Sequence, residues 1–210
     1  MTDARDQAVT LQAASICLQY PDDALLASLP AVRAAVDTLP PGRSRERLTF
    51  FLDTAAATAP NRAGQHYVDI FDNRRRCCLY LTWWTDGETR RRGAALAELK
   101  GRYRAYGAEL DTTELPDFLP IVLEFAATTD LTAGLELLQE HRPGIELLRL
   151  ALIDAETPYS APVEAVCALL PGPSPADVAA AKALARTGPP REQVGLDLAP
   201  FGLIPAGGPS

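Results

Sequence analysis

Apolar residues return every three to four positions along most of this chain, which is the spacing of one face of an α-helix. Prolines and glycines interrupt the period at short intervals and predict where one helix ends and the next begins. Strand-like runs of Val, Ile and Thr are missing from the sequence. The pattern therefore predicts an all-α protein, folded as a single-domain helical bundle. The predicted helices are, in chain order, 3–19, 22–37, 45–58, 66–84, 85–107, 117–128, 131–141, 143–156, 162–170 and 174–188.

Some of these boundaries depend on particular residues. Pro30 predicts that the second helix is divided in two, with the proline at a first helical position. Thr85 and Glu88 have the spacing of a capping box, and Gly107 is suited to a left-handed helix end. Asp117 stands directly before an apolar run that contains a proline, so it is predicted to be a helix N-cap.

The 66–84 segment is predicted to be one continuous helix. Arg74 falls in line with its apolar stripe, so we expect the Arg74 guanidinium to pair with a carboxylate from a neighbouring helix. The apolar stripe consists of Tyr67, Ile70, Phe71, Cys78 and Leu81.

The end of the chain has a different composition. Gly and Pro make up ten of the 24 residues in 187–210. A segment of this kind buries little apolar surface. We therefore predict an all-helical domain over 1–186, followed by a tail over 187–210 that is flexible or laid over the surface.

The net charge of −7 is unevenly distributed. Residues 62–107 hold ten Lys/Arg and five Asp/Glu, a net charge of +5, and the rest hold ten and 22, a net charge of −12. A basic belt inside an acidic molecule is poorly suited to nucleic acid unless one face presents it. We expect no nucleic-acid partner.

The chain also lacks the signals of a membrane protein. Its longest apolar stretches, such as 119–127, are much shorter than the ~20 residues needed to span a bilayer. The first residues, MTDARDQ, carry acids and lack the basic-then-apolar order of a secretion signal. These features predict a cytoplasmic protein without direct membrane insertion.

Residues with the spacing of a catalytic or metal site are not found. The two histidines, His66 and His141, match no Cys or Asp pattern, and hydrolase, phosphate-loop and dinucleotide motifs are absent from the sequence. We expect no enzymatic activity, no catalytic residues, no metal and no cofactor. The four cysteines form no C-x-x-C pair and are expected to be reduced, buried thiols: Cys17, Cys77, Cys78 and Cys167.

One quarter of the chain concentrates aromatic residues close to arginine triplets. Most of these aromatics are expected in the core. Tryptophan and tyrosine beside arginine are also the composition of an interaction hot spot, and a groove lined by such residues can hold an amphipathic segment of a partner. The aromatics are Tyr80, Trp83, Trp84, Tyr103 and Tyr106.

The segment 67–127 resembles the NarJ-type nitrate reductase chaperones of the TorD-like family of redox-enzyme maturation proteins. The resemblance is carried by F-D-x-R-R-R (71–76), L-Y-L-T (79–82), D-G-x-T-R-R-R-G (86–93) and E-L-P-D-x-L-P (114–120). The chain departs from the family at Phe118, where members often have His, and at Trp83-Trp84, where they often have Tyr-Tyr. The first departure leaves no imidazole at that position.

The resemblance implies an all-helical assembly chaperone without catalysis. Its client would be the molybdenum-containing catalytic subunit of respiratory nitrate reductase. The chaperone would bind the client's N-terminal segment and keep it competent for molybdenum cofactor insertion before membrane docking. From the aromatic cluster and the family motif together, the predicted peptide-binding residues are Tyr67, Phe71, Tyr80, Trp84, Asp117 and Phe118.

Two other functions are compatible with the residues. The protein could be a stable accessory subunit of the reductase, which would co-purify with the cofactor-loaded, membrane-bound enzyme. It could also bind nucleic acid through its arginine belt, which retention on heparin and a steep salt dependence would indicate.

The cysteine and histidine spacing generates a first prediction. We expect the purified protein to be colourless and free of stoichiometric metal, because no set of ligands has the required spacing. Elemental analysis checks this. Stoichiometric zinc or iron that is lost when Cys77 and Cys78 are replaced would contradict it.

Overall fold

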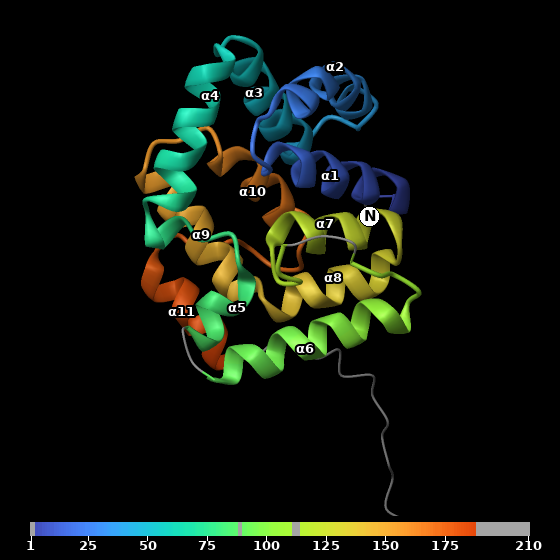
Figure 1. Ribbon diagram of the computed structural model, residues 1–210, viewed down its shortest axis with the longest axis vertical. Helices are drawn as coiled ribbons and strands as arrows, with labels where there is room; N and C mark the ends of the chain where they lie inside the picture. Colours follow the sequence, from blue (N-terminus) through green and yellow to red (C-terminus); the bar gives the residue numbers. More distant parts are fainter. Residues whose placement is uncertain (1–2, 88–89, 111–113, 188–210) are drawn as a thin grey trace, which may run out of the picture.

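The computed structural model describes residues 3–87, 90–110 and 114–187 of the chain, and within them it contains helices and no named strand (Figure 1). The all-α prediction is confirmed. The expected tail lies outside the described residues, apart from its first position, Thr187. The α-helices are α1 (Ala4–Cys17), α2 (Asp23–Asp37), α3 (Arg43–Ala56), α4 (Pro60–Tyr67), α5 (Leu81–Asp86), α6 (Arg90–Ala105), α7 (Leu119–Thr128), α8 (Leu131–Glu140), α9 (Arg142–Asp154), α10 (Ser160–Cys167) and α11 (Val178–Thr187).

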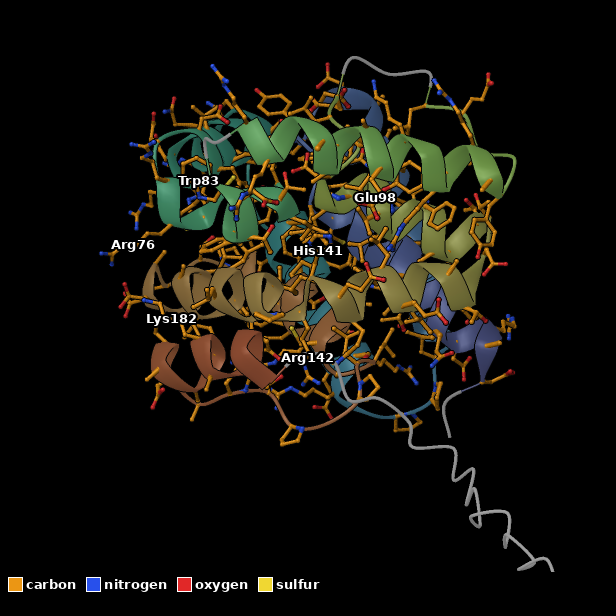
Figure 2. All side chains as sticks on the ribbon, turned by 90° about the horizontal axis from the view of Figure 1, so that it is seen from below. Arg76, Trp83, Glu98, His141, Arg142 and Lys182 are labelled. Carbon is orange, nitrogen blue, oxygen red and sulfur yellow. The ribbon has the colours of Figure 1, made fainter. Side chains whose placement is uncertain are left out.

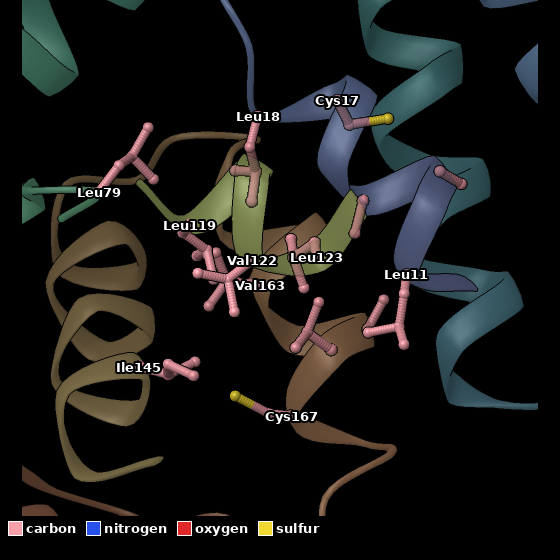
Figure 3. Packing of buried hydrophobic residues seen from close by; sticks show 14 of the residues in the cluster. Leu11, Cys17, Leu18, Leu79, Leu119, Val122, Leu123, Ile145, Val163 and Cys167 are labelled. Atoms are coloured by element: carbon pink, nitrogen blue, oxygen red, sulfur yellow. The ribbon is translucent and has the colours of Figure 1, made fainter. Parts of the chain in front are cut away.

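Helix α7 lies at the centre of the bundle. Its sequence, LPIVLEFAAT, has apolar residues on nearly every side, so it must be covered from several directions. It packs between α1 and α8, and Figure 3 shows its side chains between those of α1 and those of α9 and α10. The Ser15 hydroxyl of α1 donates a buried hydrogen bond of 2.8 Å to the carbonyl of Pro120. Leu119, Val122 and Leu123 are completely buried.

Two glycines let helices approach closely. A Cβ added to Gly134 of α8 would lie 2.2 Å from the Cβ and 2.3 Å from the Cα of Ala126, so the α7–α8 crossing leaves room only for hydrogen. A Cβ added to Gly144 of α9 would lie 2.7 Å from the Cβ of Trp84 in α5. These glycines fix the distances of α8 and α5 from their neighbours.

Helix α9 carries two buried arginines that hold the loop before α11. The Arg142 guanidinium donates to the carbonyls of Pro171, Gly172 and Pro173, and Arg149 donates to the carbonyl of Pro175. Prolines offer carbonyls but no amide protons, so a proline-rich loop laid over a core needs donors from elsewhere.

A buried carboxylate on α9 compensates the two arginines. Glu146 is completely buried and accepts from Arg149 Nε at 2.6 Å. It also lies 3.5 Å from Arg142 Nε. Both arginines thus share one buried carboxylate, and the triad ties the loop at residues 171–175 to α9.

Two helix predictions are wrong. Helix α2 continues through Pro30, because the proline is exposed and the carbonyl it leaves without an intrahelical partner can face water.

The segment 66–84 is not one helix. It passes from α4 into a π-helical turn, η1 (Val68–Asp72), a 3₁₀ turn, η2 (Arg75–Cys77), and an extended stretch before α5.

Arg74 lies at the break between the two turns. Its backbone is extended (φ −115°, ψ 100°) and its side chain is exposed, so the predicted buried pairing with a carboxylate is wrong.

The predictions for helix ends have mixed outcomes. Gly107 has φ +76° and follows the end of α6, and the amide of Ala108 donates to the carbonyl of Tyr103, so the left-handed cap is confirmed. Glu88 lies outside the described residues, and with it the capping box. None of the helices in the described part of the chain is long and apolar enough to cross a membrane.

The α7–α8 crossing generates a prediction about stability. Gly134→Ala places a methyl group against the α7 backbone, so it should lower the free energy of unfolding by about 1–3 kcal/mol. The matched control is Gly101→Ala on α6, where an added Cβ meets nothing within 4 Å. Since alanine favours the helix, the control should be more stable by about 0.5–1 kcal/mol. Denaturant unfolding of both variants measures the difference, and equal stability would contradict the close crossing.

Candidate functional site

The broken segment 66–84 builds one side of a cleft because its extended part pairs with a second extended stretch. The amide of Leu81 donates to the carbonyl of Asp117 at 2.9 Å, and the amide of Leu119 donates to the carbonyl of Leu79 at 2.8 Å. This isolated antiparallel bridge places Tyr80 directly opposite Phe118. Their ring centroids are 5.3 Å apart. Residues 38 positions apart in the sequence thus present their rings side by side.

Asp117 lies beneath this pair and is completely buried. Its Oδ2 accepts hydrogen bonds from both the amide and the hydroxyl of Thr82, at the start of α5. The N-cap of α7 is Phe118, which has no capping side chain, so the prediction that Asp117 caps this helix is wrong. The carboxylate instead accepts from the amide of Thr82 at 3.1 Å, which the bridge holds next to it.

Arg92 of α6 completes the group. Its Nη2 lies 3.6 Å from Asp117 Oδ2, and its Nε donates to the Thr82 hydroxyl at 3.1 Å. The guanidinium carbon also lies 5.7 Å from the centroid of the Tyr80 ring. One arginine therefore neutralises the buried carboxylate and supports the back of the cleft's aromatic wall.

The cleft in front of this group has a volume of about 440 Å³. Its second wall is an aromatic cluster from α4, η1 and the loop after α1. The ring centroid of Tyr67 lies 4.7 Å from that of Phe71 and 5.5 Å from that of Tyr20. We call this space the aromatic cleft. It is lined by Gln19, Tyr20, Asp22, Tyr67, Phe71, Asp72, Cys78, Leu79, Tyr80, Glu114 and Phe118.

Four of the six predicted peptide-binding residues line the aromatic cleft: Tyr67, Phe71, Tyr80 and Phe118. The other two lie behind it. Trp84 packs against Gly144, and its indole Nε1 donates to the carbonyl of Cys78 at 3.1 Å. Asp117 is buried below the bridge, so neither of these two side chains lines the cleft.

The aromatic cleft is acidic. Three of the described residues that line it are carboxylates, Asp22, Asp72 and Glu114, and none is lysine or arginine. Burial raises the pKa of both Tyr67 and Tyr80, and the hydrogen bond to Glu114 further raises the pKa of Tyr80. The phenols therefore remain protonated at neutral pH, and the negative charge comes from the carboxylates alone. The cleft suits a ligand with apolar and cationic groups.

Several cleft residues were not predicted from the sequence. Tyr20 is 51% exposed at the rim, and Asp22 stands two residues further on, where it caps α2 through the amide of Leu25 at 2.7 Å. No local pattern connects the end of α1 with residues 67–118. Glu114 is the first residue of the E-L-P-D-x-L-P motif, and this was the one feature of the sequence that could have indicated a cleft residue at that position.

The cysteines are free thiols, with three buried and Cys78 partly exposed. Burial raises the pKa of Cys17 to about 12, which leaves that thiol unreactive at neutral pH. Among the described residues, no group of three or more His, Cys, Asp or Glu side chains is placed to hold a metal ion.

The fold is that of redox-enzyme maturation proteins. The chain is similar to the crystal structure of a putative redox enzyme maturation protein from Archaeoglobus fulgidus, with a TM-score of 0.59, 77% of this chain and 92% of that chain covered, and 19% identity. At that identity the likeness shows the fold alone.

The sequence assigns the chain to a particular family, which the fold alone does not. Residues 37–164 match the family described as nitrate reductase delta subunit, which is more than half of the chain. The protein belongs to this family, as the resemblance of its motifs predicted.

Its relatives differ in length. The chain is 33% identical to the probable nitrate reductase molybdenum cofactor assembly chaperone NarJ of Bacillus subtilis, over 74% of this chain and 84% of that protein. It is 40% identical to the nitrate reductase-like protein NarX of Mycobacterium tuberculosis, over 76% of this chain. The chain spans only about a quarter of NarX (24%).

The Asp117 group generates a prediction that separates a buried carboxylate from a helix cap. Asp117→Ala should lower the free energy of unfolding by about 2–3 kcal/mol, because Thr82 loses its acceptor and Arg92 loses its ion-pair partner. Asp117→Asn should still cost about 1–2 kcal/mol, because the charge opposite Arg92 is lost.

The control is Asp130, whose carboxylate caps α8 by accepting from the Ala133 amide at 2.8 Å. Asparagine caps as well as aspartate, so Asp130→Asn should be nearly neutral. Thermal and denaturant unfolding compare the variants. A neutral Asp117→Asn would contradict the buried ion pair.

Proposed function

We propose that this protein is an assembly chaperone for a nitrate reductase. It binds the N-terminal segment of the molybdenum-containing catalytic subunit in the aromatic cleft. It keeps that subunit competent for molybdenum cofactor insertion before membrane docking. In this proposal the protein acts in the cytoplasm, carries no cofactor and catalyses no reaction.

The observation that carries the proposal is the aromatic cleft itself. Four aromatic side chains from two distant parts of the chain, Tyr67, Phe71, Tyr80 and Phe118, face one space of about 440 Å³ together with three carboxylates. Rigid aromatic walls offer large contact area at little entropic cost, and the carboxylates favour cationic side chains. The names of the NarJ relatives, which are chaperones of nitrate reductase assembly, support the identity of the client.

The bridge behind the cleft explains how the site is held ready. The bound segment would contact Tyr80 and Phe118, whose backbones are fixed by the pairing of residues 79–81 with 117–119. Trp84 and Asp117 serve this site from behind and keep the two rings in place. Because the walls are already formed, binding costs little reorganisation of the chaperone.

A permanent accessory subunit of the reductase is the second candidate. The family description, delta subunit, and the match within the longer NarX protein favour it. The two functions differ in the fate of the complex. A chaperone leaves before the enzyme is complete, whereas a subunit co-purifies in stoichiometric amount with cofactor-loaded, membrane-bound reductase.

Truncation of the cleft aromatics tests the peptide site. Phe71→Ala and Phe118→Ala should each weaken binding of a peptide with the N-terminal sequence of the cognate catalytic subunit by about 30-fold, since a hot-spot side chain contributes about 2 kcal/mol. Isothermal titration calorimetry measures the dissociation constants, and circular dichroism verifies that the variants are folded.

Phe50→Ala is the matched control. Phe50 is 51% exposed on α3 and does not line the cleft, so its loss should leave peptide binding unchanged. If both folded variants bound the peptide with wild-type affinity, the proposal that the aromatic cleft binds it would be contradicted.

A further inference from the structure

An arginine-rich surface lies beside the aromatic cleft and has no part in it. Arg74, Arg75 and Arg76 follow one another through the break after η1, and all three side chains are exposed. The guanidinium carbon of Arg75 lies 5.3 Å from the ring centroid of Trp83, a half-buried residue of α5. We call these four residues the arginine face. In Figure 2, Arg76 and Lys182 project from the same edge of the molecule.

Two of the three cations of this face, Arg74 and Arg76, have no carboxylate partner among the described residues. The arginines line a hollow of about 250 Å³ together with Cys77 and the end of α9, where one carboxylate, Asp154, is present. Lys182 adds a further exposed cation on α11, which packs on α9 as η2 does.

The break in the backbone is what presents these cations. A continuous helix over 66–84 would have spread three consecutive side chains over about 200° of its circumference, with Arg74 on the buried stripe. The turn η2 directs all three to solvent and sets Arg75 on the Trp83 ring. Tryptophan and arginine at a partly desolvated surface form a typical centre of a protein–protein contact.

We propose that the arginine face is a second docking surface, which binds an acidic patch of Asp and Glu side chains on the folded body of the client. This rests on the proposed function, because it assigns the patch to the subunit whose N-terminal segment enters the aromatic cleft. Guanidinium groups bind carboxylates through paired, charge-assisted hydrogen bonds, which fits the exposed arginines to such a patch.

The neighbouring cleft argues for a protein and against nucleic acid. Residues 71–72 and 78–80 line the acidic cleft, and residues 74–77 line the basic hollow between them along the chain. An extended polyanion on the arginine face would approach the carboxylates of Asp72 and Glu114. A protein that is acidic in one place and basic in another matches both surfaces, so opposite charges also fix its orientation.

The test uses the whole chain with two exposed arginines reversed in charge, Arg74→Glu and Arg76→Glu together. Its matched control is Lys100→Glu with Arg104→Glu, two exposed cations of α6 whose reversal changes the net charge equally. The dissociation constants are measured for the cofactor-free catalytic subunit and, separately, for its N-terminal peptide. Both are taken at low and high salt.

We expect the arginine-face variant to bind the subunit at least about 10-fold more weakly at low salt, and the defect to shrink as salt rises. Its peptide affinity should equal that of the wild type, and the α6 control should bind both normally. Equal subunit affinity of the arginine-face variant and the control would overturn the proposal. So would an equal loss of peptide and subunit binding.

Two further outcomes separate this proposal from the function it rests on. If the arginine-face variant loses the subunit while Phe71→Ala and Phe118→Ala bind the peptide normally, the second surface stands and the cleft proposal fails. If a DNA or RNA oligonucleotide binds the wild type and not the variant while subunit binding is unchanged, the arginine face belongs to nucleic acid and this proposal is overturned.

Discussion

The carboxylate of Asp117 contacts the first turn of α5 and an arginine of α6, two consecutive helices that are distant from it in the sequence. Thr82 supplies an amide and a hydroxyl, and Arg92 supplies the compensating charge. A buried carboxylate without such partners would cost several kcal/mol, so the three segments are held in one arrangement. That arrangement sets the bridge between residues 79–81 and 117–119, and with it the spacing of Tyr80 and Phe118. The aromatic cleft is a consequence of where this one charge is compensated.

Buried charges play the same structural part at the other side of the bundle. Arg142, Glu146 and Arg149 use their paired charge to hold the carbonyls of the loop at residues 171–175 against α9. In both places an arginine donates hydrogen bonds to oxygen atoms of another segment. Such groups contribute less to stability than apolar packing of the same volume would, but they specify geometry because their hydrogen bonds are directional. The described part of the chain has one isolated bridge and no named strand, so these networks hold its irregular segments in place.

The polarity of the surface bears on how a client would be recognised. Within residues 71–80 the chain contributes first to an acidic, aromatic cleft, then to a basic turn, then to the cleft again. Opposite charges so close together suit a partner that contributes a flexible cationic segment and a folded acidic surface. Two contacts of moderate strength that are joined in one partner give high combined affinity, and loss of either one permits release. This behaviour is appropriate for a chaperone whose complex is temporary.

The sequence by itself determined the helical class, most helix boundaries and four of the residues that line the cleft. Period, proline and glycine act locally, so α1, α3 and α8–α11 could be predicted within a few residues, and Gly107 ends its helix as expected. The sequence was also enough to predict that Tyr67, Phe71, Tyr80 and Phe118 belong to one binding site.

Only the tertiary structure decided where the segment 66–84 breaks and which partner Asp117 binds, because both depend on contacts between distant segments. The apolar stripe of 66–84 fits one helix equally well, and the helix breaks because Leu79 and Leu81 find hydrogen-bond partners in residues 117–119. Asp117 looked like a cap because its neighbours in sequence suit that role, whereas a residue 35 positions away competes successfully for its carboxylate. Interactions between distant segments have no local period, and they decide which of several locally possible structures forms.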